Sequence, residues 1–207
     1  MSAASSRSFS RAVRHLQTVT GETSVPDPFR YAERVEVDAP LDALWAYAGN
    51  SLLATDWSVY FHHISPLPES PVPDGQIGSL RRCYRREDET GPTWDEEVTA
   101  LVPKRYREIR TYALRNFRWV GLAARQTEYR VGQHYESLGP ERSRLTFSTE
   151  LIRPRSVLAK GAFALFARET VRIFRVNLEN IAAAVEAEHR GQPYRRPHPY
   201  EPSHALD

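Results

Sequence analysis

The sequence predicts an α+β fold, in which a curved antiparallel β-sheet of about seven strands wraps around one long C-terminal helix. From residue 63 to residue 153 the chain reads as β-strands divided by turns rich in proline and glycine, such as "DETGP" and "LGPERS", which favours hairpins. From residue 156 to residue 188 no proline occurs. Apolar residues recur there at Phe163, Phe166, Phe174, Ile181 and Val185, which predicts a single amphipathic helix.

The elements follow one another in a simple order. Residues 29–37 alternate apolar and polar side chains, which predicts a first, half-buried strand. The segment "LDALWAYAG" repeats apolar residues at helical spacing, and "SLLATDWSVYF" predicts a second short helix. The remaining strands are expected near residues 63–67, 78–87, 93–102, 106–115, 125–138 and 142–153.

The length and composition favour one folded domain between two tails. A chain of 207 residues is long enough for one substantial core. Residues 1–28 form a serine-rich arm with arginines and no acidic residue before Glu22. We expect a flexible basic arm at 1–28, a domain at 29–188, and a flexible, proline-rich tail at 189–207.

Several function classes are disfavoured by composition. The net charge is only +2, with basic and acidic residues interspersed, so nucleic-acid binding is not expected. The single cysteine, Cys83, rules out an internal disulfide, and the histidines do not form a three-ligand set, so neither a metal nor another cofactor is expected. No apolar run is long enough to cross a bilayer. We expect a cytoplasmic protein, with organellar targeting by the basic arm as the alternative.

The order of elements resembles the helix-grip fold of the START-like (SRPBCC) superfamily, which is typical of plant pathogenesis-related allergens, polyketide cyclase and dehydrase-like proteins, and lipid-transfer domains. The segments that carry the resemblance lie between residues 30 and 188. They are "VEVDAPLDALWAYAGN", "DW", "GSLRRCYR", "WDEEVTALVPKRYREIRTYAL" and "NLENI". A sheet wrapped around a helix tends to leave a tapered cavity between them. The resemblance implies that function lies on the inward faces of the strands.

The alternation along each strand predicts which residues face that cavity. The expected lining is aromatic, with a minority of hydrogen-bonding groups, and suits a hydrophobic small molecule with one or two polar ends. The residues expected to contact the ligand are Tyr31, Glu33, Tyr84, Trp94, Tyr112, Thr127, Tyr129, Gln133, Tyr135, Phe147, Phe166, Phe174 and Asn177. Asn177 has the alternative of hydrogen bonding to the sheet.

One carboxylate, Glu96, falls on the predicted inner face between Trp94 and Val98. Only one of the adjacent Arg81 and Arg82 can share that face, and the apolar set Leu80, Arg82 and Tyr84 favours Arg82. Glu96 and Arg82 are therefore the candidate catalytic pair. The alternative is a cross-strand ion pair between them with no chemical role. The segment 93–101 has apolar residues on both faces, so a β-bulge there would reverse the assignment.

Three functions remain open at this stage. The first is binding or transport of a lipid, an isoprenoid or an aromatic polyketide-like compound. The second, which the resemblance implies, is a cyclase or dehydratase that uses Glu96, Arg82 and pocket tyrosines. The third is a peripheral lipid carrier that makes weak contact with a membrane surface through "RPRSVLAKGAFALFARE" and the basic arm. Pattern alone does not predict the oligomeric state.

Overall fold

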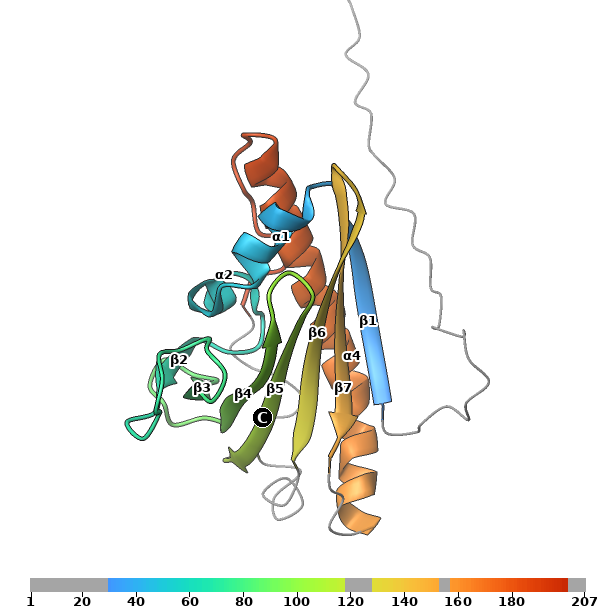
Figure 1. The fold of residues 1–207 in the computed structure, drawn as a ribbon. Coiled ribbons are helices and arrows are strands. Elements are labelled where there is room, and N and C mark those ends of the chain that lie inside the picture. The colour runs from blue at the N-terminus through green and yellow to red at the C-terminus, as the bar shows by residue number, and fades with distance from the viewer. Residues whose placement is uncertain (1–29, 118–127, 153–156, 201–207) are drawn as a thin grey trace, which may run out of the picture.

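Seven strands form one antiparallel sheet in the order β1-β7-β6-β5-β4-β3-β2. The computed structural model describes residues 30–117, 128–152 and 157–200, without the side chains of 158, 159, 162 and 164–168. The strands are β1 (Arg30–Val37), β2 (His63–Pro66), β3 (Leu80–Tyr84), β4 (Thr93–Val102), β5 (Tyr106–Arg115), β6 (Tyr129–Gly139) and β7 (Arg142–Leu151). The predicted sheet is confirmed, and Figure 1 shows its strands side by side.

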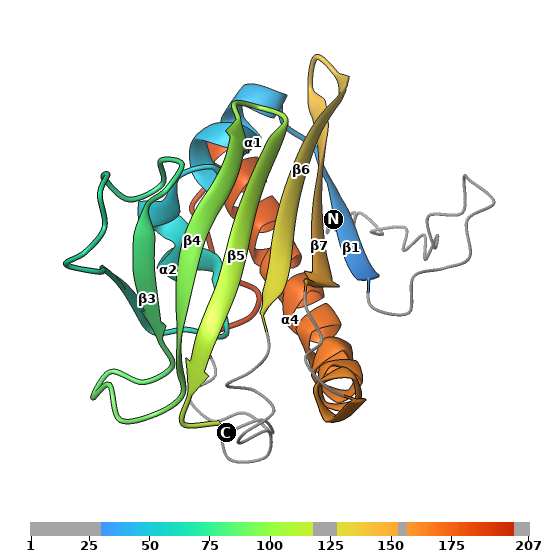
Figure 2. The same cartoon turned by 60° about the horizontal axis from the view of Figure 1, so that its bottom comes forward.

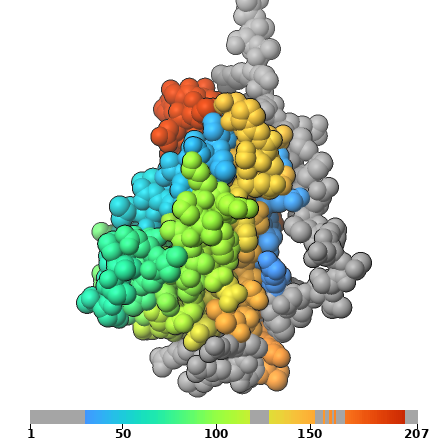
Figure 3. All heavy atoms as spheres, viewed as in Figure 1, coloured from blue at the N-terminus to red at the C-terminus, as the bar shows by residue number. Residues whose placement is uncertain are grey.

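The helices follow the first and the last strand of the chain and lie on one side of the sheet. Between β1 and β2 the chain forms α1 (Leu41–Ala48), a short 3₁₀ turn η1 (Ser51–Leu53) and α2 (Ala54–Trp57). The last element is α4 (Val157–His189), 33 residues long. Figure 2 shows α4 running along the concave side of the sheet, with α1 and α2 beside its C-terminal half. In Figure 3 the strands cover the opposite side of the molecule.

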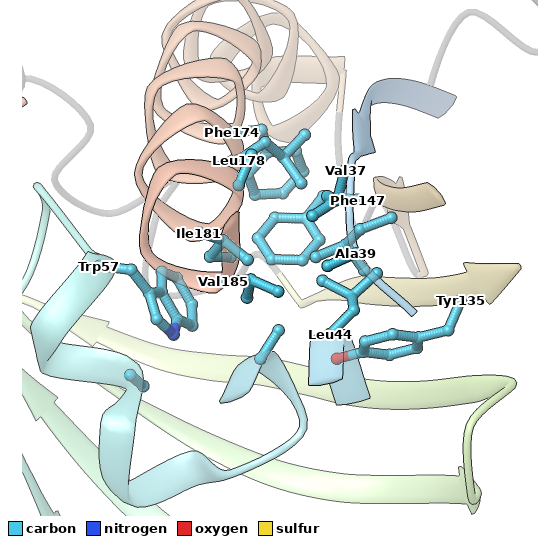
Figure 4. Packing of buried hydrophobic residues seen from close by; sticks show 14 residues of the cluster. Val37, Ala39, Leu44, Trp57, Tyr135, Phe147, Phe174, Leu178, Ile181 and Val185 are labelled. Atoms are coloured by element: carbon cyan, nitrogen blue, oxygen red, sulfur yellow. The ribbon is translucent and has the colours of Figure 1, made fainter. Parts of the chain in front are cut away.

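Helix α4 packs on the sheet through one apolar stripe. Phe174, Leu178, Ile181 and Val185 repeat at spacings of three and four and are buried, which is the pattern of a helix with one core-facing side. Figure 4 shows these side chains pointing toward Phe147 of β7 and toward Val37 and Ala39. Since α4 contacts mainly β1 and β7, the strands on the far side of the curved sheet lie farther from the helix. This geometry leaves room for a cavity beneath them.

The proline-rich tail departs from the expectation. Helix α4 ends just before Gly191, whose positive φ of 63° suits a residue without a side chain. The chain then turns back, and His198 exchanges two backbone hydrogen bonds with the buried Asn180 side chain, both 2.9 Å long. Arg196 donates to the Ser58 carbonyl and Tyr200 to the Arg85 carbonyl. Side-chain hydrogen bonds therefore join residues 196–200 to the domain, which the polar composition of the tail did not predict. The arm at 1–28 lies outside the described residues.

Candidate functional site

A cavity of about 100 Å³ lies between α4, the α1–α2 segment and the inner face of β3 to β7. This space is large enough for several water molecules. Much of its wall is aromatic, and the rings of Trp57, Tyr60, Phe61, Trp94, Phe147 and Phe174 all contribute to it. Polar side chains enter from four neighbouring strands. The wall is therefore apolar with a small number of polar groups, as in typical small-molecule sites.

The polar groups occupy two rows across the sheet, because residues paired between neighbouring strands share a face. In the first row Arg81 pairs with Glu96, Glu96 with Thr111, and Thr111 with Tyr129. In the second row, Arg107 pairs with Gln133. Between them Ile109 of β5 pairs with Val98 and Val131. Arg107 and Thr111 are four residues apart on one strand, which corresponds to about 13 Å at the usual rise per residue. An apolar band thus separates the two rows. We call the first row, with Arg81, Glu96, Thr111 and Tyr129, the first polar station, and the second row, with Arg107 and Gln133, the second polar station.

In the first station Glu96 is held entirely by donors. Arg81 donates to one carboxylate oxygen from Nε at 2.9 Å and from Nη2 at 2.7 Å. Trp94 Nε1 donates to the other oxygen at 2.9 Å. The Arg81 side chain is 6% exposed and that of Glu96 is 12% exposed, and Asp74 approaches the other side of Arg81 at 3.7 Å. The carboxylate is part of a buried ion pair rather than a group standing alone in the cavity.

The choice of Arg82 for the inner face is wrong. Arg82 pairs in register with Asp95 on the outer face, where its Nε lies 2.7 Å from an Asp95 oxygen. Arg115 binds the same carboxylate from β5 at 2.7 Å and 3.0 Å. Burial raises the pKa of Asp95, but hydrogen bonds from Arg115 and Arg82 hold it below its ordinary value. The residue opposite Glu96 is Arg81, one position earlier, and a shift of one residue moves a side chain to the other face.

The same reversal affects two tyrosines expected in the cavity. Tyr84 lies on the outer face of β3, where its ring stacks on His63 with 4.5 Å between ring centres. Tyr112 lies on the outer face of β5, beneath the guanidinium of Arg110 at 4.7 Å. Neither residue lines the cavity. Each of these strands has a tyrosine on its outer face, so a prediction that places aromatic residues inside assigns it to the wrong face.

Three further residues have the predicted parity but do not reach the cavity. Glu33 binds Arg175 of α4 at 2.9 Å. Tyr31 packs near Phe163, with 6.1 Å between ring centres. Tyr135 packs against Trp45 at 4.9 Å, deeper in the core. Thr127 and the side chain of Phe166 lie outside the described residues. The expected residues that do line the cavity are Trp94, Glu96, Tyr129, Gln133, Phe147, Phe174 and Asn177.

Asn177 points into the cavity as expected, but its hydrogen bond goes to the loop after α2 and not to the sheet. It lines the cavity, and its amide oxygen accepts a 2.9 Å hydrogen bond from the backbone of Val59. One turn later on α4, Asn180 donates to the Trp57 carbonyl at 2.9 Å. These two amides therefore fix the loop after α2, which forms part of the cavity wall.

Tyr129 contributes a hydroxyl group to the first station. Burial, together with the nearby Tyr60 and Glu96, raises the pKa of Tyr129 well above its ordinary value. The hydroxyl consequently keeps its proton at neutral pH and can donate to a ligand oxygen. A protonated tyrosine in an apolar wall suits a carbonyl or hydroxyl group of a ligand.

Arg107 is the main cavity residue missed from the sequence. It is 4% exposed, and its Nη2 donates to the Gly49 carbonyl at the end of α1. No carboxylate of the described residues lies within ion-pair distance of it, and its Nε has no hydrogen-bond partner among them. Burial lowers the pKa of Arg107. The signal was present in "YREIRTY", where Ile109 marks the inner parity and places Arg107 and Thr111 beside it.

Across 30–117, 128–152 and 157–200, no three His, Cys, Asp or Glu side chains are grouped so as to hold a metal ion. In the same ranges none of the helices has the length and apolar character needed to cross a membrane.

Comparison with solved structures shows which fold this is. The Zhui aromatase/cyclase from Streptomyces sp. R1128 superposes with a TM-score of 0.59 at 16% identity, covering 79% of this chain and 98% of the cyclase. The chain has the helix-grip fold. Norcoclaurine synthase from Thalictrum flavum, solved with dopamine and hydroxybenzaldehyde, gives a TM-score of 0.55 at 14% identity over 84% of this chain and 98% of the synthase.

A third structure of this fold is Ara h 8.0201, with a TM-score of 0.51 and 11% identity over 73% of this chain and 96% of its own. No protein-family model and no curated protein matches the sequence. Identities this low establish the fold and leave the function to be argued from the site.

Proposed function

We propose that this protein binds a hydrophobic small molecule in the cavity between α4 and the sheet. The observation that carries the proposal is the wall itself, in which seven aromatic side chains line a space with two separate polar stations. A ligand with an apolar body and a polar group at each end would match this order of polar, apolar and polar surface. Lipids, isoprenoids and aromatic polyketide-like compounds all have this general character.

The ion pair in the first station supports binding over catalysis. Three donated hydrogen bonds from Arg81 and Trp94 occupy Glu96. A general base needs a carboxylate oxygen within reach of a substrate proton, and here both oxygens already accept from protein donors. The pair of Glu96 and Arg81 instead forms a fixed polar part of the cavity wall. Tyr129, in the same row, can donate a hydrogen bond to the ligand.

Filling the cavity tests this proposal directly. Ile173 of α4 lines the cavity and is 6% exposed, whereas the neighbouring Arg172 points to solvent with 47% of its side chain exposed. We expect the neutral fluorescent probe N-phenyl-1-naphthylamine to bind the wild type and Arg172→Trp equally. Ile173→Trp should bind it at least about tenfold more weakly, because the indole occupies ligand volume.

Two outcomes would contradict the proposal. The first is equal probe affinity in folded Ile173→Trp and in the wild type, which would place the probe elsewhere. The second is the absence of probe binding to the wild type. Native mass spectrometry of the protein purified from its own host, followed by organic extraction, would then identify the class of any bound compound.

A second candidate function is a cyclase or dehydratase, because Glu96 and the protonated Tyr129 line the same cavity. Acid and base groups flanking one apolar space are what such an enzyme needs. This candidate requires turnover that is lost in Glu96→Gln while circular dichroism shows an intact fold. Unchanged turnover in that variant would remove Glu96 from any mechanism.

The peripheral lipid carrier stays a prediction. The segment on which it was based, residues 153–169, lies largely outside the described residues and side chains. Co-sedimentation with vesicles of graded anionic lipid content tests it. Binding that ignores both the lipid charge and substitution of Arg153 or Arg155 would count against this function.

A further inference from the structure

The second polar station contains a buried cation, Arg107, that has no counter-ion among the described residues. Arg107 is 4% exposed, so its charge has little contact with bulk water. The two carboxylates closest to the cavity arginines, Glu96 and Asp74, are both bound to Arg81. The only hydrogen bond that Arg107 makes within the described part of the chain is to the neutral carbonyl of Gly49. A buried charge that is left uncompensated is costly.

The groups around Arg107 are hydrogen-bond donors. Gln133 is directly opposite on β6, and its amide oxygen already accepts from the Tyr135 hydroxyl at 3.1 Å. Its amide nitrogen is therefore the end that remains for a ligand. Asn50 follows Gly49 and also lines the cavity, and its oxygen is used by the Leu52 backbone at 3.0 Å. The oxygens of both amides are thus engaged, which leaves donors.

Trp57 adds a further donor to the same region. Its ring lies 5.9 Å from that of Phe147, which is paired with Gln133 in the second row. The indole Nε1 is buried and has no hydrogen-bond partner among the described residues. An anion can accept hydrogen bonds from all of these donors, which are one guanidinium, two amide nitrogens and one indole N–H. A neutral group would leave the guanidinium charge unbalanced, and a cationic group would be repelled by it.

We propose that the ligand is a hydrophobic acid and that Arg107 binds its carboxylate, with Gln133, Asn50 and Trp57 as supporting donors. The planar guanidinium matches a carboxylate in shape and charge. The acid enters as the missing counter-ion of Arg107, and its apolar body lies along Ile109 and Val131 toward Tyr129. This inference rests on the proposed function and narrows the ligand class.

A matched pair of probes tests the charge alone. The acid 2-naphthoate and the alcohol 2-naphthylmethanol share one ring system and differ in the group that would meet Arg107. At pH 7 the wild type should bind the acid at least about tenfold more tightly than the alcohol in isothermal titration calorimetry, since hydrogen bonds between charged groups are the stronger ones. Arg107→Met should abolish this preference and leave the alcohol affinity within about twofold.

Two further variants separate binding from structure. Arg107→Lys retains the positive charge and should keep part of the preference for the acid, even if Arg107→Met folds poorly. Arg110→Met is the matched control, because Arg110 is on the same strand, faces outward and has 40% of its side chain exposed. It should leave both affinities unchanged. If Arg107 only clamps the end of α1, its loss will weaken both probes equally.

The results distinguish this inference from the proposed function. Equal binding of acid and alcohol by the wild type, or a preference for the acid that survives in Arg107→Met, would overturn the assignment of Arg107 while leaving a hydrophobic cavity. Failure of both probes and of N-phenyl-1-naphthylamine to bind the wild type would overturn the proposed function, and this inference with it.

Discussion

Replacing Glu96 by glutamine removes the charge from one half of the buried pair with Arg81 while preserving the shape of the side chain. The two side chains are 12% and 6% exposed and are joined by hydrogen bonds of 2.9 Å and 2.7 Å. Breaking a buried ion pair costs about 3–5 kcal/mol, because the remaining charge is left without its partner. Asp74 stays 3.7 Å from Arg81, so we expect the lower end, about 3 kcal/mol.

The matched control is the same substitution at an exposed pair. Glu36 accepts from Arg142 at 2.5 Å and from Arg144 at 2.7 Å, with 41% of its side chain exposed. Exposed pairs contribute about 0–1 kcal/mol. Urea unfolding at pH 7, followed by circular dichroism, should therefore show Glu96→Gln less stable than Glu36→Gln by about 2 kcal/mol or more.

A double-mutant cycle measures the interaction itself. Arg81→Met alone should also cost about 3 kcal/mol, since it leaves the Glu96 carboxylate buried with only Trp94 as donor. The double variant Arg81→Met/Glu96→Gln should cost less than the sum of the single variants by about 2 kcal/mol. Strict additivity, or a Glu96→Gln cost no larger than that of Glu36→Gln, would refute the reasoning that burial makes this pair strong.

Three other outcomes follow from the structure. Since the folded pKa of Asp95 lies below its ordinary value of 3.8, its contribution to stability is present above pH 3.8 and is lost as pH falls through the folded pKa; urea unfolding of Asp95→Asn should lose less stability on acidification, and parallel curves would contradict this. Cys83 is fully buried and burial raises the pKa of its thiol, so Ellman's reagent at pH 8 should react only on unfolding, and a reaction within seconds would be inconsistent. Asn180→Ala removes hydrogen bonds to Trp57 and His198; it should cost about 2–4 kcal/mol and speed trypsin cleavage after Arg195, whereas unchanged cleavage would show that the tail is held otherwise.

The element order was predictable because it depends on periodicity over long segments. The 33-residue helix α4 and the alternation along β6 and β7 are strong patterns. On β7 the inner-face prediction of Phe147 holds, and Leu145 and Thr149 are buried on the same face. The outer residues of this strand are polar, so the contrast between its faces is clear. Where one face is apolar and the other is not, burial follows directly from the sequence.

On β3 and β5 the same prediction of the inner face failed, for two physical reasons. On β3 the inner face carries Arg81, whose charge is balanced by Glu96 on the next strand, so a buried position looks polar in the sequence. On β5 the backbone of Ala113 has a positive φ of 51°. Leu114 is buried although it has the same parity as the outward Tyr112. A single irregular residue thus made the wrong face look apolar, as bulges do.

The two arginines that line the cavity, Arg81 and Arg107, differ in how their charge is balanced. Both lie on inner faces and both are nearly fully buried. Arg81 is neutralised by residues of its own chain, and its role is therefore complete without a ligand. Arg107 has a buried position and a neutral acceptor, but no carboxylate of the described residues beside it. Because one neutral carbonyl offsets little of the cost of burying this charge, a ligand that supplies the anion best explains the position of Arg107.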